Sequence, residues 1–222
     1  MSNAATRSGV VRDSLGVGIA VGAYGFAFGA SSVAAGLTVA QSSLLSLLAF
    51  TGGTQFAVVG VVAGGGGMAA ALASGLLLGA RNTLYAMRLS PLLRVRGVRR
   101  LLAALGTIDE STAMAVAQPS PPLARVAFWW TFGGVFVFWN LTTLLGALVG
   151  SLVDPATIGL DAVVPAAFLA LLAPRLRAGV TEVRVAVAGA VIAAALIPFT
   201  PPGVPVLTAC AALLLAGRVR AS

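Results

Sequence analysis

Histidine and lysine are both absent from this chain of 222 residues, and cysteine occurs once, as Cys210. Without histidine the chain lacks the side chain that most often serves as a general base or metal ligand near neutral pH. A lone cysteine cannot form a disulfide within the chain, so it says nothing about the redox compartment. The six acidic residues are scattered. We therefore expect neither an enzyme, nor a metal site, nor a bound cofactor.

Charge is also scarce, since 9% of the residues are charged whereas 59% are apolar. Soluble domains carry about 25% charged residues, and a single soluble core cannot bury this much apolar surface, so the solvent must be lipid. The stretch between Asp13 and Arg81 has no charged residue and is long enough for three spanning helices of roughly 20 residues each. Because the bilayer offers no water to the backbone, we expect an all-α membrane protein.

The net charge of +8 comes from 14 arginines against six acids. A nucleic-acid-binding surface clusters basic residues, usually lysine together with arginine, on a face that meets water. Here the arginines lie between hydrophobic runs, as the topology rule for membrane proteins requires. We therefore expect a lipid bilayer, and no nucleic acid, as the partner of this charge.

The hydropathy pattern predicts about seven hydrophobic segments with at least one broken helix. Residues 1–13 form an N-terminal tail, residues 14–217 a single polytopic membrane domain, and residues 218–222 a C-terminal tail. Four glycines at residues 64–67 indicate a tight turn between the second and third segments. Glycines four residues apart, such as Gly18 and Gly22, favour close helix packing. The seven segments are residues 14–36, 41–63, 68–89, 126–152, 157–173, 183–199 and 203–217.

The arginine distribution orients the C-terminal half. Residues 91–125 are rich in arginine and are predicted to be a cytoplasmic connection with a short polar helix, and the C-terminus is then cytoplasmic too. The N-terminal half is ambiguous, because three full crossings place Arg7 and Arg12 outside. The preferred topology keeps seven crossings with the N-terminus outside. The alternatives are an early segment that is broken or re-entrant, or a further crossing by residues 101–118.

Residues 101–118 place Asp109 and Glu110 between two apolar stretches. Thr107 and Glu110 have the spacing of a capping box, which predicts a helix start near Ile108. Two interpretations remain open: a cytoplasmic interfacial helix with solvated acids, or a half-helix whose acids point into a cavity. Acids at membrane depth often relay protons in transporters, so Asp109 and Glu110 are the candidate coupling residues.

A polar sequence at residues 51–56 interrupts the second hydrophobic segment. Its two glycines each weaken a helix by roughly 1 kcal/mol relative to alanine, which favours a discontinuous helix. Such a break exposes free N–H groups at a half-helix N-terminus, where a substrate carboxylate can bind. The alternative is a kink or a close-packing site in which threonine bonds back to its own helix. The candidate substrate-binding residues here are Thr51, Thr54, Gln55 and Phe56.

A second polar group lies in the third segment. Arg81 is past the middle of that segment, where it needs a carboxylate, carbonyl groups or a substrate as partner, unless it snorkels to the headgroups. Tyr85 follows one helical turn later on the same face, and Asn82 is adjacent. Tyr24, in a glycine-rich stretch of the first segment, completes the candidate substrate-binding set. A contact between an acid and an arginine, such as Asp109 with Arg81, would be the most informative structural observation.

Five short sequences carry a resemblance to a known family. They are Gly-Phe-Ala-Phe-Gly at residues 25–29, Gly-Thr-Gln-Phe-Ala at 53–57, Ala-Arg-Asn-x-Leu-Tyr at 80–85, Asp-Glu-Ser at 109–111, and Leu-Asp with Pro-Ala-Ala-Phe within 160–168. Together, and in this order, they resemble the AzlC family, the large subunits of branched-chain amino acid exporters. The resemblance runs from about residue 14 to the end of the chain. Two positions depart from the family pattern: Gly79 stands where the family often has asparagine, and Asn82 where it often has histidine.

The resemblance implies a secondary transporter in the plasma membrane that exports branched-chain amino acids, with methionine as a further candidate, driven by the proton gradient. It also implies a small membrane partner similar to AzlD. A histidine cannot carry the proton here, because the chain has none. The alternative is a non-transporting structural or regulatory subunit of a membrane complex.

On this hypothesis the substrate carboxylate docks at the half-helix end near Gln55, or on Arg81. The substrate ammonium meets Asp109, Glu110 or the carbonyl groups freed by the helix break. Loss of export is then the predicted result of Gln55→Ala and of Arg81→Ala.

Overall fold

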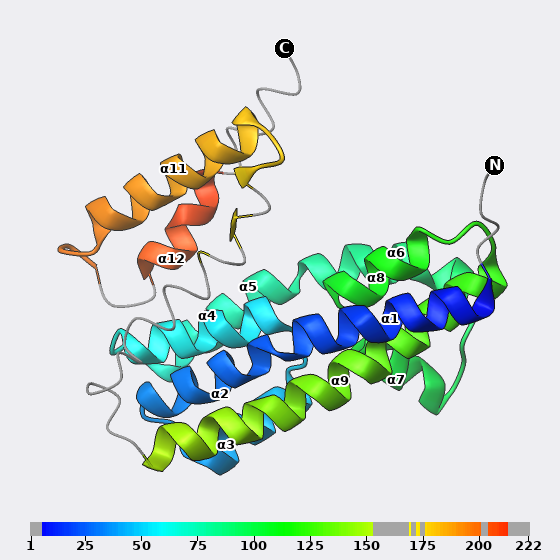
Figure 1. The fold of residues 1–222 in the computed structure, drawn as a ribbon. Helices are drawn as coiled ribbons and strands as arrows, with labels where there is room; N and C mark the ends of the chain where they lie inside the picture. The colour runs from blue at the N-terminus through cyan, green and yellow to red at the C-terminus, as the bar shows by residue number, and fades with distance from the viewer. Residues whose placement is uncertain (1–5, 153–168, 170–171, 174–175, 201–203, 213–222) are drawn as a thin grey trace.

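The computed structural model describes residues 6–152, 169, 172–173, 176–200 and 204–212, and within them every regular element is a helix (Figure 1). The prediction of an all-α membrane protein is confirmed, and many leucine and valine side chains remain exposed on the outside of the helices. The helices are α1 (Arg7–Gly22), α2 (Tyr24–Ala34), α3 (Val39–Leu48), α4 (Gly52–Ala63), α5 (Met68–Gly79), α6 (Arg81–Leu93), α7 (Val98–Leu105), α8 (Asp109–Val116), α9 (Pro121–Leu152), α11 (Val180–Leu196) and α12 (Val204–Ala209), with a 3₁₀ turn at Cys210–Ala212.

The first and fourth hydrophobic segments lie side by side and run in the same direction (Figure 1). α1 begins at Arg7, inside the stretch assigned to the N-terminal tail. The helix starts there because the Thr6 side chain accepts a hydrogen bond from the Gly9 N–H (3.2 Å) and caps it. A kink at Ala23 separates α1 from α2, and α9 packs along both.

Glycines allow these helices to approach closely. A Cβ atom placed on Gly18 would lie 2.9 Å from the backbone carbon of Gly134 in α9. Cβ atoms on Gly25 and Gly29 would likewise collide with the α9 backbone, and one on Gly146 of α9 would collide with the α2 backbone. The spacing of four that the sequence displays is therefore a packing seam between two helices.

The second hydrophobic segment is a broken helix, as predicted. α3 and α4 are separated by residues 49–51, and the Gln55 side-chain amide in α4 donates back to the carbonyl oxygens of Ser46 (3.3 Å) and Ala49 (3.0 Å). α3 and α4 thus form an antiparallel pair that enters and leaves at one end of the bundle (Figure 1). The break reverses the chain, so residues 41–63 do not run straight through the bundle, and this favours the re-entrant alternative over the preferred full crossing; the membrane side of each end stays a prediction.

The four glycines form the predicted turn between α4 and α5. Gly65 has a φ of +77°, a conformation that glycine adopts without strain. α5 then packs antiparallel to α4, and α6 continues its direction beyond Ala80. The pair α5–α6 therefore runs through the bundle toward the end where α1 begins (Figure 1).

α7 and α8 form a second re-entrant pair, which enters from the opposite end. Ala103 of α7 and Ala115 of α8 both belong to the cluster around Phe128, near the start of α9. Ile108, which lies between the two helices, instead packs with Phe132, one turn further along α9. The chain thus runs inward along α7 and outward along α8, so the connection predicted to be cytoplasmic contains two short helices.

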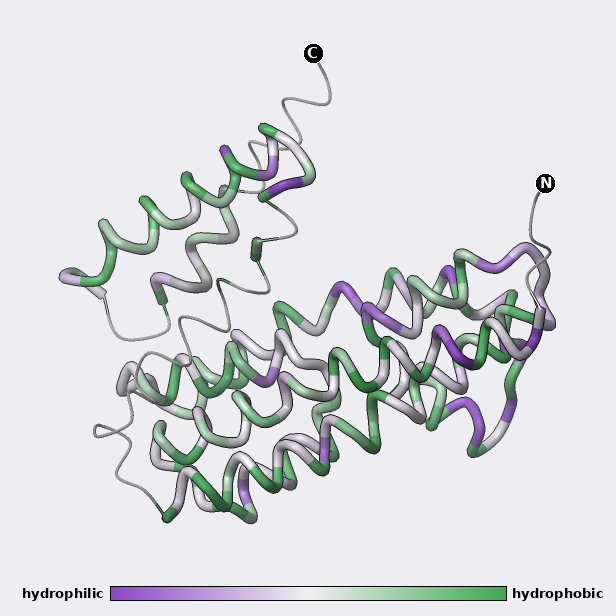
Figure 2. Tube along the Cα trace, in the orientation of Figure 1, coloured by the Kyte–Doolittle hydropathy of each residue, from purple (hydrophilic) through white to green (hydrophobic). Residues whose placement is uncertain are grey.

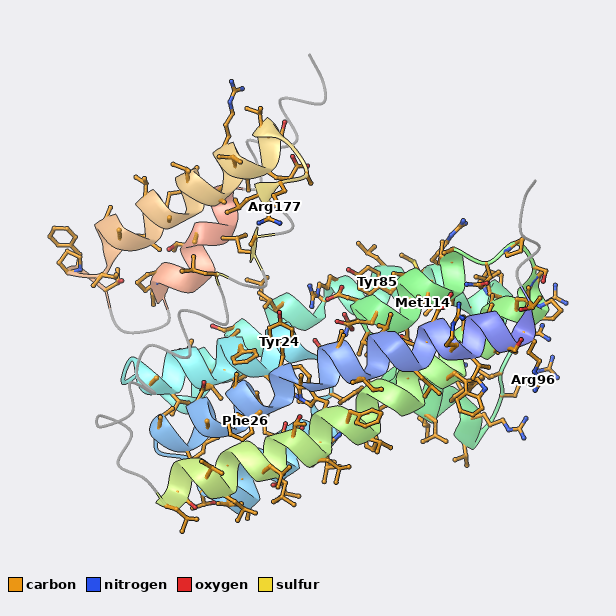
Figure 3. All side chains as sticks on the ribbon, in the orientation of Figure 1. Tyr24, Phe26, Tyr85, Arg96, Met114 and Arg177 are labelled. Carbon is orange, nitrogen blue, oxygen red and sulfur yellow. The ribbon has the colours of Figure 1, made fainter. Side chains whose placement is uncertain are left out.

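This arrangement removes the conflict over the N-terminal arginines. The start of α1 and Arg96 lie at the same end of the bundle (Figures 1 and 3). Because α3–α4 folds back, the chain traverses the bundle twice between these two positions, once along α1–α2 and once in return along α5–α6. Arg7 and Arg12 can therefore share one side of a membrane with the arginines near Arg96, as the positive-inside rule requires.

By length and composition, two helical stretches of the described residues are able to cross a membrane. They are Arg7–Ala34, with 28 residues, and Pro121–Leu152, with 32 residues. At 1.5 Å per residue, α9 is roughly 48 Å long and exceeds a hydrocarbon layer of about 30 Å. α3 and α4 are apolar but shorter, which fits helices that end within the bundle.

α11 and α12 fall in the predicted sixth and seventh segments and pack against each other. The fifth segment, 157–173, lies mostly outside the described residues, and the tail 218–222 lies entirely outside them. The membrane side of the C-terminus therefore stays a prediction from the arginine distribution.

Candidate functional site: a central cavity between two helix N-termini

A cavity of about 430 Å³ lies where the tips of both re-entrant pairs meet the middle of α9. The α1–α2 kink and the α5–α6 junction close its other sides. We call it the central cavity. It is lined by Val21, Tyr24, Phe50, Thr51, Gly52, Gly53, Leu78, Arg81, Ile108, Asp109, Glu110, Val135, Trp139 and Leu172.

The N-terminus of α4 faces this cavity, and no side chain caps its first backbone N–H groups. Thr51 is the N-cap in extended conformation, and Gln55 is the first residue whose N–H bonds back to it (3.0 Å). The Thr51 hydroxyl donates to the Thr54 hydroxyl (3.2 Å) and does not cap the helix. The first N–H groups of α4 therefore carry the partial positive charge of a helix N-terminus and can bind an anion.

The two glycines at this N-terminus allow a close approach of neighbouring side chains. A Cβ atom on Gly52 would lie 2.9 Å from the Trp139 ring, and one on Gly53 would lie 3.2 Å from the Arg81 guanidinium. Glycine therefore lets an aromatic ring and a cation approach the helix end. Together, the helix end and Arg81 make one side of the central cavity positive.

The N-terminus of α8 faces the same cavity with the opposite charge. Its first two residues are Asp109 and Glu110, and both line the cavity. Of the two interpretations of residues 101–118, the half-helix whose acids face a cavity is therefore the one observed. The tips of the two re-entrant pairs also fold alike, because the Thr51 N–H bonds to Ala49 O (2.7 Å) as the Ile108 N–H bonds to Gly106 O (3.0 Å).

The predicted capping box at the start of α8 is not formed. The N-cap residue of α8 is Ile108, and the Thr107 hydroxyl instead lies back along α7, where it donates to the carbonyl oxygen of Ala103 (2.6 Å). The Ser111 hydroxyl accepts a hydrogen bond from the Ile108 N–H (3.2 Å) and donates to Gly106 O. The helix starts where it was predicted, but a serine within the first turn stabilises the tip.

Arg81 and Asp109 form an ion pair across the central cavity. Arg81 Nη2 lies 2.8 Å from Asp109 Oδ2, and the Tyr85 hydroxyl donates to Asp109 Oδ1 (2.6 Å). This is the acid–arginine contact that the sequence suggested. The two charged side chains are 36% and 37% exposed, so the pair is reachable from the cavity. Arg81 Nε and Asn82 Oδ1 are buried without a hydrogen-bond partner among the described residues.

Gln55 holds the broken helix together from behind the cavity. It is fully buried, its amide nitrogen donates to the end of α3, and its Oε1 accepts from Trp139 Nε1 (3.0 Å). Phe56 is also fully buried and packs edge-on against Phe28, with ring centres 5.5 Å apart. Both residues therefore fix the walls of the cavity and do not line it.

The predicted site residues thus fall into two groups. Most of them line the central cavity or hydrogen-bond to one of its charged side chains; the others stand behind its wall or, for Thr54, on a separate apolar groove between α3, α4 and α5. No three His, Cys, Asp or Glu side chains gather as a metal site in the part of the chain that is described. The first group is Tyr24, Thr51, Arg81, Tyr85, Asp109 and Glu110, and the second is Thr54, Gln55, Phe56 and Asn82.

Sequence reasoning missed the apolar wall. Trp139 covers the end of α4 and receives its orientation from Gln55, and Phe50 lies in the break itself. A tryptophan in the middle of a spanning segment, far from the interfacial belt where tryptophans gather, is a signal for such a role. Val135 lies one turn before Trp139 on the same face of α9, and no local pattern distinguishes it from lipid-facing valines.

Comparison with known proteins shows which family this sequence resembles. The family described as AzlC protein matches residues 16–153. The inner membrane protein YgaZ of Escherichia coli (strain K12) is 30% identical over 149 residues, which is 63% of this chain and 59% of YgaZ. The chain thus aligns with less than two thirds of that relative. No solved structure matches. The family match spans both re-entrant pairs and α9, and with them every lining residue of the central cavity except Leu172.

Proposed function

This chain belongs to the AzlC family, and from that premise we propose that it is a multi-pass transporter subunit that exports branched-chain amino acids across the plasma membrane. Export is proton-coupled, and methionine is a further candidate substrate. One observation carries the proposal: the central cavity presents a positive helix end with Arg81 and, opposite them, a negative pair at Asp109 and Glu110. A zwitterion matches this polarity.

The substrate carboxylate binds at the positive side. The bare N–H groups at the start of α4 and the Arg81 guanidinium converge there, because Gly53 leaves room for the guanidinium. Helix N-termini at a break bind substrate carboxylates in transporters of other families.

The substrate ammonium binds at Asp109 and Glu110. In the structure Asp109 already holds a cation, the Arg81 guanidinium, at 2.8 Å. The zwitterion therefore replaces an internal ion pair. The substrate carboxylate binds the Arg81 guanidinium, and the substrate ammonium binds the Asp109 carboxylate. Protonation of Asp109 or Glu110 removes the negative charge that holds the ammonium, which is how proton entry is coupled to substrate release.

The apolar side chain of the substrate packs on the remaining wall. Val21, Phe50 and Trp139 supply aliphatic and aromatic surface beside the charged groups. The volume of about 430 Å³ lies within the range of roughly 300–1,000 Å³ typical of small-molecule sites. A branched aliphatic chain gains from this wall, whereas a polar side chain would lose its hydration there.

A small AzlD-like membrane subunit completes the exporter. The exposed apolar helix faces offer it a place within the bilayer, since leucines such as Leu72 and Leu76 on α5 are 57% and 75% exposed. Lipid covers the same kind of surface, so these faces are not specific to one partner. No nucleic acid is part of this function.

The test is efflux from bacteria that lack their own exporters. Cells are loaded with dipeptides containing valine, leucine, isoleucine or methionine. The internal amino acid concentrations are then followed in cells that express this chain alone, the AzlD-like partner alone, or both. Lower internal amino acid with both subunits supports the proposal. Arg81→Ala, inserted in the membrane at the wild-type level, should abolish that effect.

The competing function is a structural or regulatory subunit that carries no substrate. It predicts that Arg81→Ala alters the amount of assembled complex while the residual complex keeps its substrate preference. Unchanged internal amino acids, despite both subunits being inserted, would reject the proposed export of branched-chain amino acids.

A further inference from the structure

A pocket lined by arginines lies at the end of the bundle where α6, α7 and the start of α9 meet. Its volume is about 780 Å³. Figure 3 shows Arg96 at this end, and Figure 2 shows hydrophilic colours gathering there. We call it the arginine pocket. It is separate from the central cavity and is lined by Leu93, Arg94, Val95, Arg96, Arg99, Leu102, Arg125 and Trp129.

No carboxylate neutralises this pocket within the described residues. Among the described residues two ion pairs form, Arg12 with Asp13 and Arg81 with Asp109. Neither involves a residue of the arginine pocket. The lining contains four arginines and no acid. Guanidinium groups held close together repel one another unless an anion lies among them, so the pocket is complementary to a negative ligand.

The backbone holds two of these arginines in place. The half-buried Arg125 donates from Nε to the carbonyl oxygen of Leu92 (2.9 Å), which leaves its terminal nitrogens for a ligand. Arg94 ends α6 as its left-handed C-cap (φ 50°), and its Nε donates to the carbonyl oxygen of Pro91 (3.3 Å).

Apolar surface adjoins the charged groups. Leu93, Leu102 and Trp129 line the pocket beside the arginines. On α7, Val98 and Leu101 are each 72% exposed, next to Arg99 and Arg100. The start of α7 therefore presents apolar and cationic side chains side by side at this end of the bundle. A free phosphate would use the arginines alone, whereas a phospholipid would use both surfaces.

We infer that the arginine pocket binds the headgroup phosphate of an anionic phospholipid, whose acyl chains lie over the apolar side of α7 and Trp129. Guanidinium forks bind phosphate oxygens in pairs. Basic pockets between membrane helices recognise anionic lipids in this way. The site is independent of the proposed export, because it shares no residue with the central cavity.

The test uses the full chain purified in detergent, where membrane orientation no longer matters. The protein is mixed with equal phosphatidylglycerol and phosphatidylcholine, and the lipid that stays bound is measured by native mass spectrometry. The variant is Arg96→Gln with Arg99→Gln, both exposed side chains. The control removes the same charge elsewhere, by Arg177→Gln with Arg184→Gln. A competition arm adds inorganic phosphate and glycerol phosphate.

The wild type and the control should retain phosphatidylglycerol in preference to phosphatidylcholine. The pocket variant should retain at least roughly tenfold less phosphatidylglycerol, since each arginine near an anionic headgroup contributes to binding. Equal retention by the pocket variant and the control overturns the inference. Displacement of the lipid by millimolar inorganic phosphate also overturns it, because the site then recognises phosphate without the acyl chains.

Discussion

Arg81 and Asp109 are the two side chains on which the proposed chemistry depends most. Their ion pair sits at 2.8 Å between the two re-entrant tips, with the Tyr85 hydroxyl on the second oxygen of the carboxylate. Neither charge is deeply buried, so the pair can open without the full cost of stranding a charge in lipid. This is the property that a substrate with both charges would exploit.

Asp109→Asn should lower export of branched-chain amino acids by about tenfold or more, a loss of about 1.4 kcal/mol of transition-state binding. Asparagine has nearly the same shape but no charge to hold the substrate ammonium. The measurement is the initial efflux rate at matched membrane levels. Asp13→Asn is the control, because Asp13 pairs with Arg12 at 3.5 Å on the surface and such pairs contribute little. Wild-type export by Asp109→Asn would remove this carboxylate from the site.

Gln55→Ala should act through stability. The substitution leaves the Trp139 indole N–H and the carbonyl oxygens at the end of α3 without their buried partner. Each unsatisfied buried group costs about 1–3 kcal/mol, so the purified variant should unfold at a clearly lower temperature. Gln118→Ala is the matched control, since the Gln118 side-chain amide donates to the carbonyl oxygen of Met114, a local contact four residues back along the chain. If both variants melt like the wild type, Gln55 does not brace the break.

The packing of α1–α2 on α9 depends on glycines that face the seam, and α1 offers a matched pair to test this. Gly18→Ala should destabilise the protein by roughly 1–3 kcal/mol, because its new Cβ atom would lie 2.9 Å from the α9 backbone. Gly16→Ala should be neutral or stabilising by up to about 1 kcal/mol, because nothing lies within 4 Å of that Cβ position and alanine favours the helix. Thermal unfolding in detergent compares the two, and equal effects would contradict a close seam.

The re-entrant α3–α4 pair makes a prediction about membrane sides. Ala40→Cys and Gly67→Cys flank the pair at its two ends, and both positions are exposed. On a background in which Cys210 is replaced by alanine, an impermeant thiol reagent should label both from the same side of the membrane. Arg96→Cys, at the other end of the bundle, should label from the opposite side. Labelling of residues 40 and 67 from different sides would mean that the segment crosses fully.

Across the whole molecule, local sequence predicted where a helix is interrupted better than it predicted which way the chain runs after the interruption. The Gly-Gly step at residues 52–53 predicts an interrupted helix because glycine weakens helices wherever it stands. The reversal of the chain depends on Gln55 reaching back to α3 and across to Trp139, partners nine and 84 positions away. No local propensity encodes such contacts, so the sequence alone left a crossing and a re-entrant segment as alternatives.

The candidate site shows the same division. Arg81 and Asp109 were found because charge within apolar segments is costly and demands a partner. The Thr107–Glu110 capping box did not form because Ile108 is the N-cap residue of α8 and the Thr107 hydroxyl lies toward the Ala103 carbonyl oxygen in α7, an orientation that spacing alone does not predict. The apolar wall was missed because valine and phenylalanine are common on every face of a membrane helix, whether it meets lipid or a cavity.

The central claim is that one cavity binds both charges of an amino acid, with the carboxylate at α4 and Arg81 and the ammonium at Asp109 and Glu110. The most direct measurement compares the binding of three ligands to the purified chain with its partner subunit. They are leucine, 4-methylpentanoate, which lacks the ammonium, and 3-methylbutylamine, which lacks the carboxylate. Leucine should bind at least about tenfold more tightly than either analogue, since each analogue leaves one charged side of the site without its partner. Equal binding of leucine and either analogue would contradict the claim.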